Sequence, residues 1–166
     1  MTALPHRPDL LFPAEPGQRA VARELFALVR DLPLISPHGH VDAGLLADDA
    51  PFDDPARLIV VPDHYLTRML HSQGVPPSAL GVPRLTGEPV ETDGRTVWRT
   101  FARHWHLFRG TPSRLWLELV LGEVFDVRLR LTPETADEIY DALLDRLARP
   151  EFRPRALFER FRLEVL

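Results

Sequence analysis

The chain has 166 residues, 45% of them hydrophobic and 27% charged, which is typical of one globular domain with a buried core. Its net charge of −4 gives no basic surface for a nucleic-acid partner. With no cysteine, disulfides, thiolate metal sites and cysteine nucleophiles are excluded, and because all 20 basic residues are arginine, so is Schiff-base chemistry on lysine. No apolar run reaches membrane-spanning length and no leader pattern opens the chain, so we expect a cytoplasmic protein without a membrane partner.

An amphipathic helix is predicted at residues 16–30. Pro16 suits its first turn, and Asp31 to Pro33 end it. Four apolar residues recur along it at helical spacing and predict a face turned toward the core: Val21, Leu25, Leu28 and Val29.

Two histidines follow the clearest strand candidate of the first half, residues 33–37. Pro37 cannot donate to a sheet ladder, so the strand should finish there, with His38 and His40 just beyond its end. In an extended chain, side chains at i and i+2 point to the same side. His38 and His40 would then offer two imidazoles to one divalent metal, with further ligands from elsewhere. The spacing leaves an alternative open, a proline- and glycine-rich turn with two exposed histidines.

Residues 41–61 are interrupted by prolines and read as a solvated loop with a helical turn. A helix should then open at Asp63, a suitable N-cap, and run to Ser72, with Leu66, Met69 and Leu70 on its core face. Its first turns also carry three polar side chains: His64, Tyr65 and Arg68. Together these could handle a proton and an anion, or they could be ordinary surface side chains.

The second half is predicted to be helical. A loop at 75–89 precedes a helix at 92–108 with an aromatic core stripe: Val97, Trp98, Phe101, Trp105 and Phe108. Another helix starts at Thr111 with an apolar face that includes Leu115, Trp116, Leu119 and Val120. Thr132-Pro133-Glu134 predicts the start of a helix that runs to Ala148. A short helix at 151–161 and a strand beginning at about 162–166 complete the chain.

The predicted fold class is therefore mainly α with a few short strands. Only two strand candidates bracket the long helical segment 41–160. The chain is either a single mainly helical domain with a small strand pair, or the front part of a larger α/β protein.

Several stretches, in order, resemble the uronate isomerase (glucuronate isomerase) family, a branch of the amidohydrolase superfamily. Residues 32–40 resemble the first barrel strand of that family, which ends in His-x-His. The segment from Asp63 to Leu70 is similar to its Asp-His-Tyr-x-x-Arg motif, and is the more specific match. Further likeness lies at Thr111-Pro112 with Trp116, and at residues 135–140. The family has Thr-His-Leu-Glu where this chain has residues 117–120.

The resemblance implies that residues 1–166 form one domain, the N-terminal segment of a (β/α)8 TIM barrel. The first strand would lie at about 33–37, a helical insertion at 41–160 and the second strand at about 162–166. It implies that His38 and His40 are metal ligands, with zinc the expected divalent metal, bound weakly or not at all by the chain alone. The remaining ligand and the catalytic aspartate belong to later strands of the family.

The activity implied is the aldose–ketose isomerisation of a hexuronate, in which a proton moves between C2 and C1 through an enediolate. Tyr65 and His64 would be catalytic, and His64, Tyr65 and Arg68 would bind the sugar acid. A homo-oligomer, or the remainder of the barrel, is the implied macromolecular partner. Two alternatives stay open: a metal-dependent amidohydrolase that cleaves lactones, esters or amides, and a non-catalytic helical binding domain.

Overall fold

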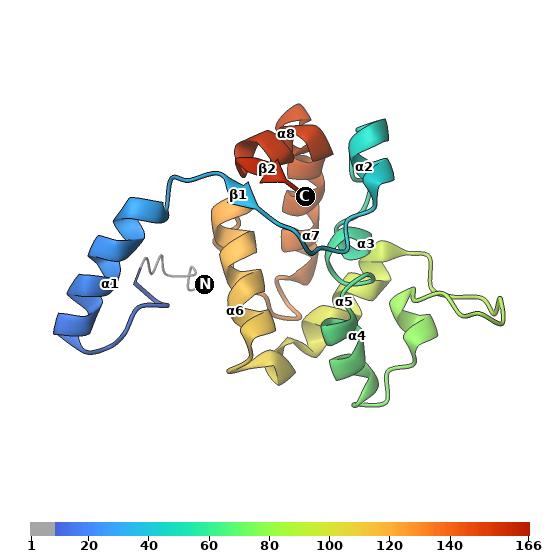
Figure 1. Cartoon of the computed structure of the whole chain (residues 1–166). Coiled ribbons are helices and arrows are strands. Elements are labelled where there is room, and N and C mark those ends of the chain that lie inside the picture. Colours follow the sequence, from blue (N-terminus) through green and yellow to red (C-terminus); the bar gives the residue numbers. More distant parts are fainter. Residues whose placement is uncertain (1–8) are drawn as a thin grey trace. The chain divides into compact units, whose positions relative to one another are not determined.

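The computed structural model describes residues 9–166, which form a mainly helical structure with one two-stranded sheet (Figure 1). By its contacts the chain divides into two compact units. We call Pro51–Phe152 the helical unit, and the described residues up to Ala50 together with Arg153–Leu166 the strand unit. Each unit is described by itself.

The strand unit joins the two ends of the described chain through a parallel strand pair. Its elements are α1 (Pro16–Val29), β1 (Leu34–Ile35), α2 (Ala43–Asp48), α8 (Pro154–Arg160) and β2 (Leu163–Val165). The amide of Leu34 donates to the carbonyl of Arg162 at 2.8 Å, and the amide of Ser36 donates to that of Val165 at 2.9 Å. Both strands lie within the ranges given by the sequence.

Helix α1 forms where it was predicted, but its apolar face is uncovered. The Glu15 carboxylate caps the helix by accepting from the amides of Gly17 and Gln18, and Pro16 occupies the first turn. No residue of α1 is buried. The four side chains predicted to face the core are 53–76% exposed: Val21, Leu25, Leu28 and Val29. The helical spacing predicted the helix correctly and its burial wrongly.

The helical unit contains the hydrophobic core. Its α-helices are α3 (Pro55–Ile59), α4 (His64–His71), α5 (Gly94–Arg103), α6 (Pro112–Leu119) and α7 (Ala136–Leu147). The 3-10 turns η1 (Pro77–Leu80), η2 (Trp105–Phe108) and η4 (Pro150–Phe152) and the π-helical turn η3 (Val120–Val124) connect or extend them. All five residues of the predicted aromatic stripe are buried. The indole N–H of Trp98 donates to the Ala136 carbonyl at 2.9 Å and links α5 to α7.

Asp54 joins three elements of the helical unit. Its carboxylate accepts from the amides of Ala56 and Arg57, which caps α3, and from the Tyr140 hydroxyl of α7 at 3.1 Å. A Cβ atom on Gly94, the first residue of α5, would overlap the Asp54 carboxylate, so any other residue there would displace that side chain. Burial, aided by the negative charge of Asp54, raises the pKa of Tyr140 to about 12.

Two expectations about the helical unit fail at its turns. The helix predicted at 92–108 is interrupted at His104, where the backbone leaves the helical region and η2 begins. The helix predicted to start at Thr132-Pro133-Glu134 forms and ends near Ala148 as expected, but α7 begins only at Ala136. The hydroxyl of Thr135 donates to the carbonyl of Arg130 at 2.7 Å, and the amide of Thr132 donates to Thr135 Oγ1 at 3.0 Å. These bonds close a turn ahead of the helix.

The segment 41–61, predicted to be a solvated loop with a helical turn, forms two short helices, α2 and α3. Each begins at an aspartate whose carboxylate accepts from helix amides: Asp42 for α2 and Asp54 for α3. The final helix, predicted from residue 151, begins only at Pro154, because η4 occupies residues 150–152. The helix predicted from Thr111 ends at Leu119, and the chain continues as the π-helical turn η3. Of the large apolar side chains in these two elements, Leu117 and Leu121 are buried, whereas Trp116 and Leu119 of the predicted apolar face are exposed.

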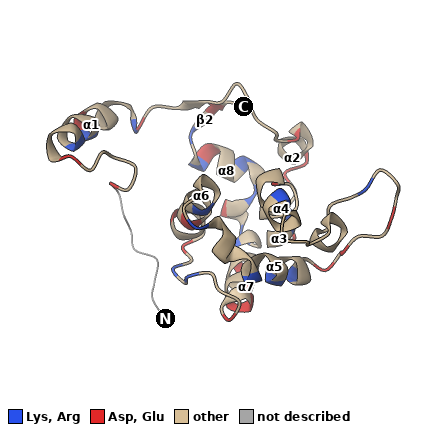
Figure 2. Ribbon diagram, turned by 90° about the horizontal axis from the view of Figure 1, so that it is seen from below, with Lys and Arg blue, Asp and Glu red and all other residues tan. Residues whose placement is uncertain are grey.

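Charged residues are distributed over both units. Figure 2 shows basic residues on α5 beside acidic residues on α7. Arg99 pairs with Asp137 through two hydrogen bonds of 2.8 and 2.9 Å, which hold the pKa of that carboxyl below its usual range. Between residues 9 and 166 no helix is both long and apolar enough to cross a membrane.

Candidate functional site

His38 and His40 lie just beyond β1 with their rings close together. The ring centroids are 5.3 Å apart and the ring planes are inclined by 68°. Two imidazoles bound to one tetrahedral zinc, at about 2 Å from the ring nitrogens, have centroids about 5 Å apart. The centroid separation is therefore compatible with one shared ion. Both side chains are exposed, as the alternative of a surface turn also required.

The loop that carries the histidines is held by its neighbours in the strand unit. The Ser36 hydroxyl donates to the carbonyl of His38 at 3.2 Å. Asp42 begins α2 and accepts from the amide of Gly44 at 2.8 Å. A Cβ atom on Gly39 would lie 3.8 Å from a methyl group of Leu166, so the loop lies next to the residue that follows β2.

Two imidazoles are only part of a metal site. Within residues 9–166 no group of three or more histidine, cysteine, aspartate or glutamate side chains could hold a metal ion. Any metal bound by His38 and His40 must therefore complete its coordination with water or with groups outside the described chain.

The second group of predicted site residues lies on α4, in the helical unit. Asp63 caps this helix through the amides of Tyr65 and Leu66, as its sequence predicted. The rings of His64 and Tyr65 are 4.3 Å apart, and Tyr65 is 65% exposed. Arg68 is also exposed and lies about one turn further along. On the opposite face, Leu66 and Leu70 are fully buried and fix the helix to the core.

A hollow of about 450 Å³ lies beside Tyr65. It is lined by Tyr65 and Met69 of α4, by Phe108, and by the start of α6 at Thr111, Pro112 and Ser113. The sequence marked Thr111 and Pro112 as a helix start and did not connect them with Tyr65. No pattern within either segment carries that information, because the two segments are brought together by tertiary packing, with Phe108 in the same lining.

The two groups of site residues lie in different units. The structure brings His38 to His40 and His64 to Tyr65. That both groups act on one substrate is implied by the family resemblance and stays a prediction.

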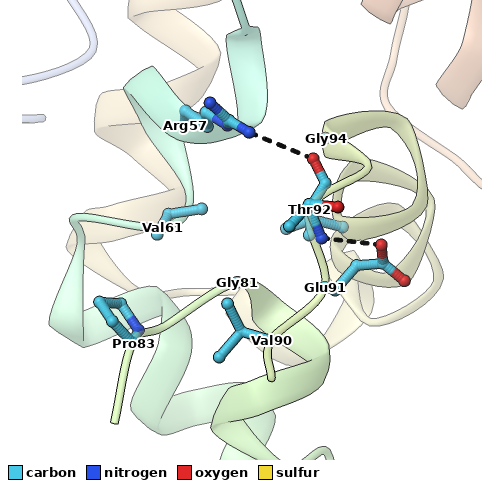
Figure 3. A pocket seen from close by; sticks show the side chains of 9 residues that line it. Arg57, Val61, Gly81, Pro83, Val90, Glu91, Thr92 and Gly94 are labelled. Carbon is cyan, nitrogen blue, oxygen red and sulfur yellow. Dashed lines mark hydrogen bonds between the residues drawn. The ribbon is translucent and has the colours of Figure 1, made fainter. Parts of the chain in front are cut away.

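A second hollow of about 340 Å³ lies between α3, η1 and the loop that precedes α5 (Figure 3). Its polar groups are engaged with one another. Arg57 donates to the carbonyl of Thr92 at 3.3 Å, and the Glu91 carboxylate accepts from the amides of Thr92 and Asp93. The remaining lining is largely apolar, with Val61, Pro83 and Val90. These internal bonds explain the charged residues without a ligand.

Comparison with known proteins identifies the family. The family model for glucuronate isomerase matches residues 17–166, so the chain belongs to the glucuronate isomerase family. It is 57% identical over 168 residues to the uronate isomerase of Rhizorhabdus wittichii and 56% identical over 159 residues to that of Mesorhizobium japonicum. These matches include 100% and 96% of this chain, but only 35% and 34% of the two relatives.

The solved structures that resemble this chain belong to the same family. The crystal structure of glucuronate isomerase from Caulobacter crescentus matches 99% of this chain with a TM-score of 0.93 and 51% identity. That of uronate isomerase from Thermotoga maritima matches 98% with a TM-score of 0.81 and 27% identity. The chain covers 34% and 33% of these two proteins, so it spans about a third of the length of its relatives. The family resemblance in the sequence is confirmed, whereas a hydrolytic amidohydrolase gains no support.

Proposed function

We propose that this chain supplies the front third of a uronate isomerase, which interconverts an aldose and a ketose hexuronate such as D-glucuronate and D-fructuronate. The observation that supports this most directly is the pair of imidazoles beyond β1, in a chain that belongs to the glucuronate isomerase family. The activity belongs to the complete protein, and the chain alone is expected to turn over nothing.

The proposed context of the strand pair is a (β/α)8 barrel. A parallel two-stranded sheet is rarely stable alone, because parallel sheets are normally covered on both faces. Here both residues of β1 are exposed, and so are Val165 and Leu166. In a complete barrel, further strands would pair with the edges of β1 and β2, and the barrel interior and the outer helices would cover these side chains. The helical unit then corresponds to an insertion between the first two strands.

His38 and His40 would hold a divalent metal, with zinc the proposed ion. Neutral imidazole is a common zinc ligand, and the ring separation fits one shared ion. The metal would polarise an oxygen of the substrate and so stabilise negative charge that develops during isomerisation. No acid or base role is assigned to the two histidines, because ligation occupies them.

The α4 residues would act on the sugar acid. Isomerisation removes a proton from one carbon, delivers one to its neighbour and shifts a proton between the two oxygens. Tyr65, exposed beside a hollow, is the proposed proton carrier for an oxygen. His64 would donate a hydrogen bond to a substrate oxygen, and Arg68 would help to neutralise the carboxylate. The base at carbon would come from the part of the protein beyond this chain.

The test is complementation. We would express this chain together with the remaining two thirds of the Rhizorhabdus wittichii relative, joined in one polypeptide, and measure conversion of D-glucuronate to D-fructuronate in the presence of zinc. We expect turnover by the joined protein and none by this chain alone. A folded joined protein without isomerase activity on any hexuronate would contradict the proposal, and so would robust turnover by the chain alone.

Matched variants separate the proposed roles. Tyr65→Phe in the joined protein should lower kcat by about a hundredfold or more if the hydroxyl carries a proton. The double variant His38→Ala/His40→Ala should lose bound zinc as well as activity. A suitable control is Tyr140→Phe, because Tyr140 is buried and bonded to Asp54 in the core, and its loss should leave kcat almost unchanged.

A further inference from the structure

We propose that Arg155 and Arg162, from the C-terminal end of the chain, are positioning residues that hold the histidine loop, residues 37–43, as a clamp through the segments on either side of it. Arg155 binds the end of α2, which follows the loop, and Arg162 binds the residues ahead of β1, which precedes it. This inference rests on the proposed metal site at His38 and His40. It adds that the geometry of the site depends on two arginines that touch neither histidine.

Arg155 holds the end of α2, the helix that follows the histidine loop. Its guanidinium donates to the carbonyls of Leu46 and Ala47, each at 2.7 Å, and its backbone amide donates to the Asp49 carboxylate at 2.9 Å. These carbonyls belong to the last turn of α2, which lacks helical partners for them. A planar guanidinium can serve two such acceptors at once, which a lysine cannot do in the same geometry. Arg155 thus ties α2 to α8.

Arg162 holds the residues ahead of β1, the strand that precedes the histidine loop. Its guanidinium donates to the carbonyl of Arg30 at 3.0 Å and to Asp31 Oδ1 at 3.4 Å, just ahead of β1. The backbone of Arg162 is in the left-handed region, with φ of 52°, and its own carbonyl accepts from the Leu34 amide. One residue therefore binds β1 through its backbone and the chain before β1 through its side chain.

Between these two anchors the histidine loop is held only by surface contacts: the Ser36 hydroxyl, the Asp42 cap and the side chain of Leu166 beside Gly39. Every residue from Pro37 to Ala43 is exposed, so packing in a core does not fix the imidazoles. The order of the loop must come from these contacts, the strand pairing and the two arginines. If an anchor is lost, the loop samples arrangements in which only one imidazole reaches a given ion, and the apparent affinity falls with the fraction of chains still competent to bind with both.

The experiment uses Cu²⁺ as the probe and the full 166-residue chain. Pulsed EPR of bound Cu²⁺ distinguishes coordination by two imidazoles from coordination by one, and calorimetric titration gives the dissociation constant. Arg155→Ala should raise the dissociation constant about tenfold and convert the two-imidazole signal largely to a one-imidazole signal. Arg155→Lys keeps the positive charge but loses the planar guanidinium that serves two carbonyls, and should give an intermediate dissociation constant. Arg162→Gln is preferred to alanine, since it retains a long polar side chain at the left-handed position, and should raise the constant about threefold.

The matched control is Arg153→Ala. Arg153 is an exposed arginine two residues from Arg155, and its side chain makes no cap hydrogen bond to α8. It should leave both readouts unchanged. Far-UV circular dichroism verifies that each variant is folded, and if Arg155→Ala is not, Arg155→Lys decides.

The outcomes separate the two proposals. A two-imidazole signal in the wild type that is lost in Arg155→Ala and kept in Arg153→Ala supports the clamp. A two-imidazole signal of equal affinity in the wild type and in all folded arginine variants overturns the clamp and leaves the metal site standing. No two-imidazole signal in the wild type, with affinity equal to that of His38→Ala/His40→Ala, overturns both.

Discussion

The two units of this chain differ in how far their apolar side chains are buried. In the helical unit, Leu66, Leu70, Ile139 and Leu143 are completely buried, and aromatic rings fill the space between α5 and η2. In the strand unit, Pro154 is the one buried residue among those described. Similar proportions of leucine and valine in sequence therefore give a closed core in one unit and an uncovered surface in the other.

The difference shows what holds each unit together. Burial of apolar area stabilises the helical unit by about 1.5–3 kcal/mol for each fully buried large side chain. The strand unit relies on helix caps, strand pairing and arginine hydrogen bonds, whose net contributions are smaller. Exposed apolar surface of this extent is typical of a surface that another part of a protein covers. The rest of the proposed barrel would be that part.

This difference between the units can be tested by making the same substitution, leucine to alanine, in each of them. Leu66→Ala, in the core, should lower the free energy of unfolding by about 3 kcal/mol or more, through lost burial and the cavity left behind. Leu28→Ala, on the 76% exposed side chain of α1, should change it by less than about 0.5 kcal/mol. Urea unfolding followed by far-UV circular dichroism measures both. Equal losses would mean that the face of α1 is covered in solution.

A second test concerns the close contact at Asp54. Gly94→Ala places a methyl group where Asp54 Oδ2 lies, so the carboxylate must move away from the α3 amides and from Tyr140. Loss of a cap and of a buried hydrogen bond should cost about 2 kcal/mol. Gly122→Ala is the control, because its methyl group would meet only the end of Arg128 at 3.8 Å. That variant should be neutral or slightly more stable, and a comparable loss there would contradict the explanation.

Much of the helical unit was predictable from the sequence, because its signals are local and agree with its packing. The Asp63 cap and the leucines of α4 predicted the right element and the right burial, and the aromatic stripe of α5 and η2 predicted the right burial. The errors came from competition between local signals. Thr132 and Thr135 hydrogen-bond to each other and to nearby carbonyls, so a threonine–proline pair that often starts a helix closes a turn instead.

The candidate site was predictable only in its parts. His-x-His after a short apolar run gave the adjacent imidazoles, and the resemblance gave the α4 residues. The arginine clamp was not predictable, because Arg155 and Arg162 are separated from α2 and Arg30 by more than 100 residues. One arginine among 20 carries no mark in the sequence that distinguishes its partners. The uncovered face of α1 has a similar cause, since periodicity reports that a face is apolar and not what covers it.

Tyr140 gives a smaller test in the helical unit, at alkaline pH. Its pKa is raised from 10.0 to about 12 in the folded chain, by burial first and then by Asp54. The unfolded state therefore loses this proton at lower pH than the folded state, so the stability that Tyr140 provides is complete below pH 10 and is lost as pH rises toward 12. Tyr140→Phe should cost about 1 kcal/mol at neutral pH and show a shallower loss between pH 10 and 12. Unfolding curves with parallel pH dependence in the two proteins would disprove this.

The smallest effect is expected at the exposed pair of Arg99 and Asp137. Hydrogen bonds from Arg99 hold the pKa of the Asp137 carboxyl below its usual range, so the stabilisation is complete above that range and is lost as pH falls through the lowered value. Both side chains are half exposed, and solvent and salt screen such a pair. A double-mutant cycle with Arg99→Ala and Asp137→Ala should show a weak favourable coupling at low salt that disappears in 1 M NaCl. Arg95 donates to the same carboxylate, so the cycle repeated in Arg95→Ala should give a stronger Arg99 coupling, because one competing donor is gone. A coupling that persists in high salt would instead mean that this side of α5 is shielded from solvent.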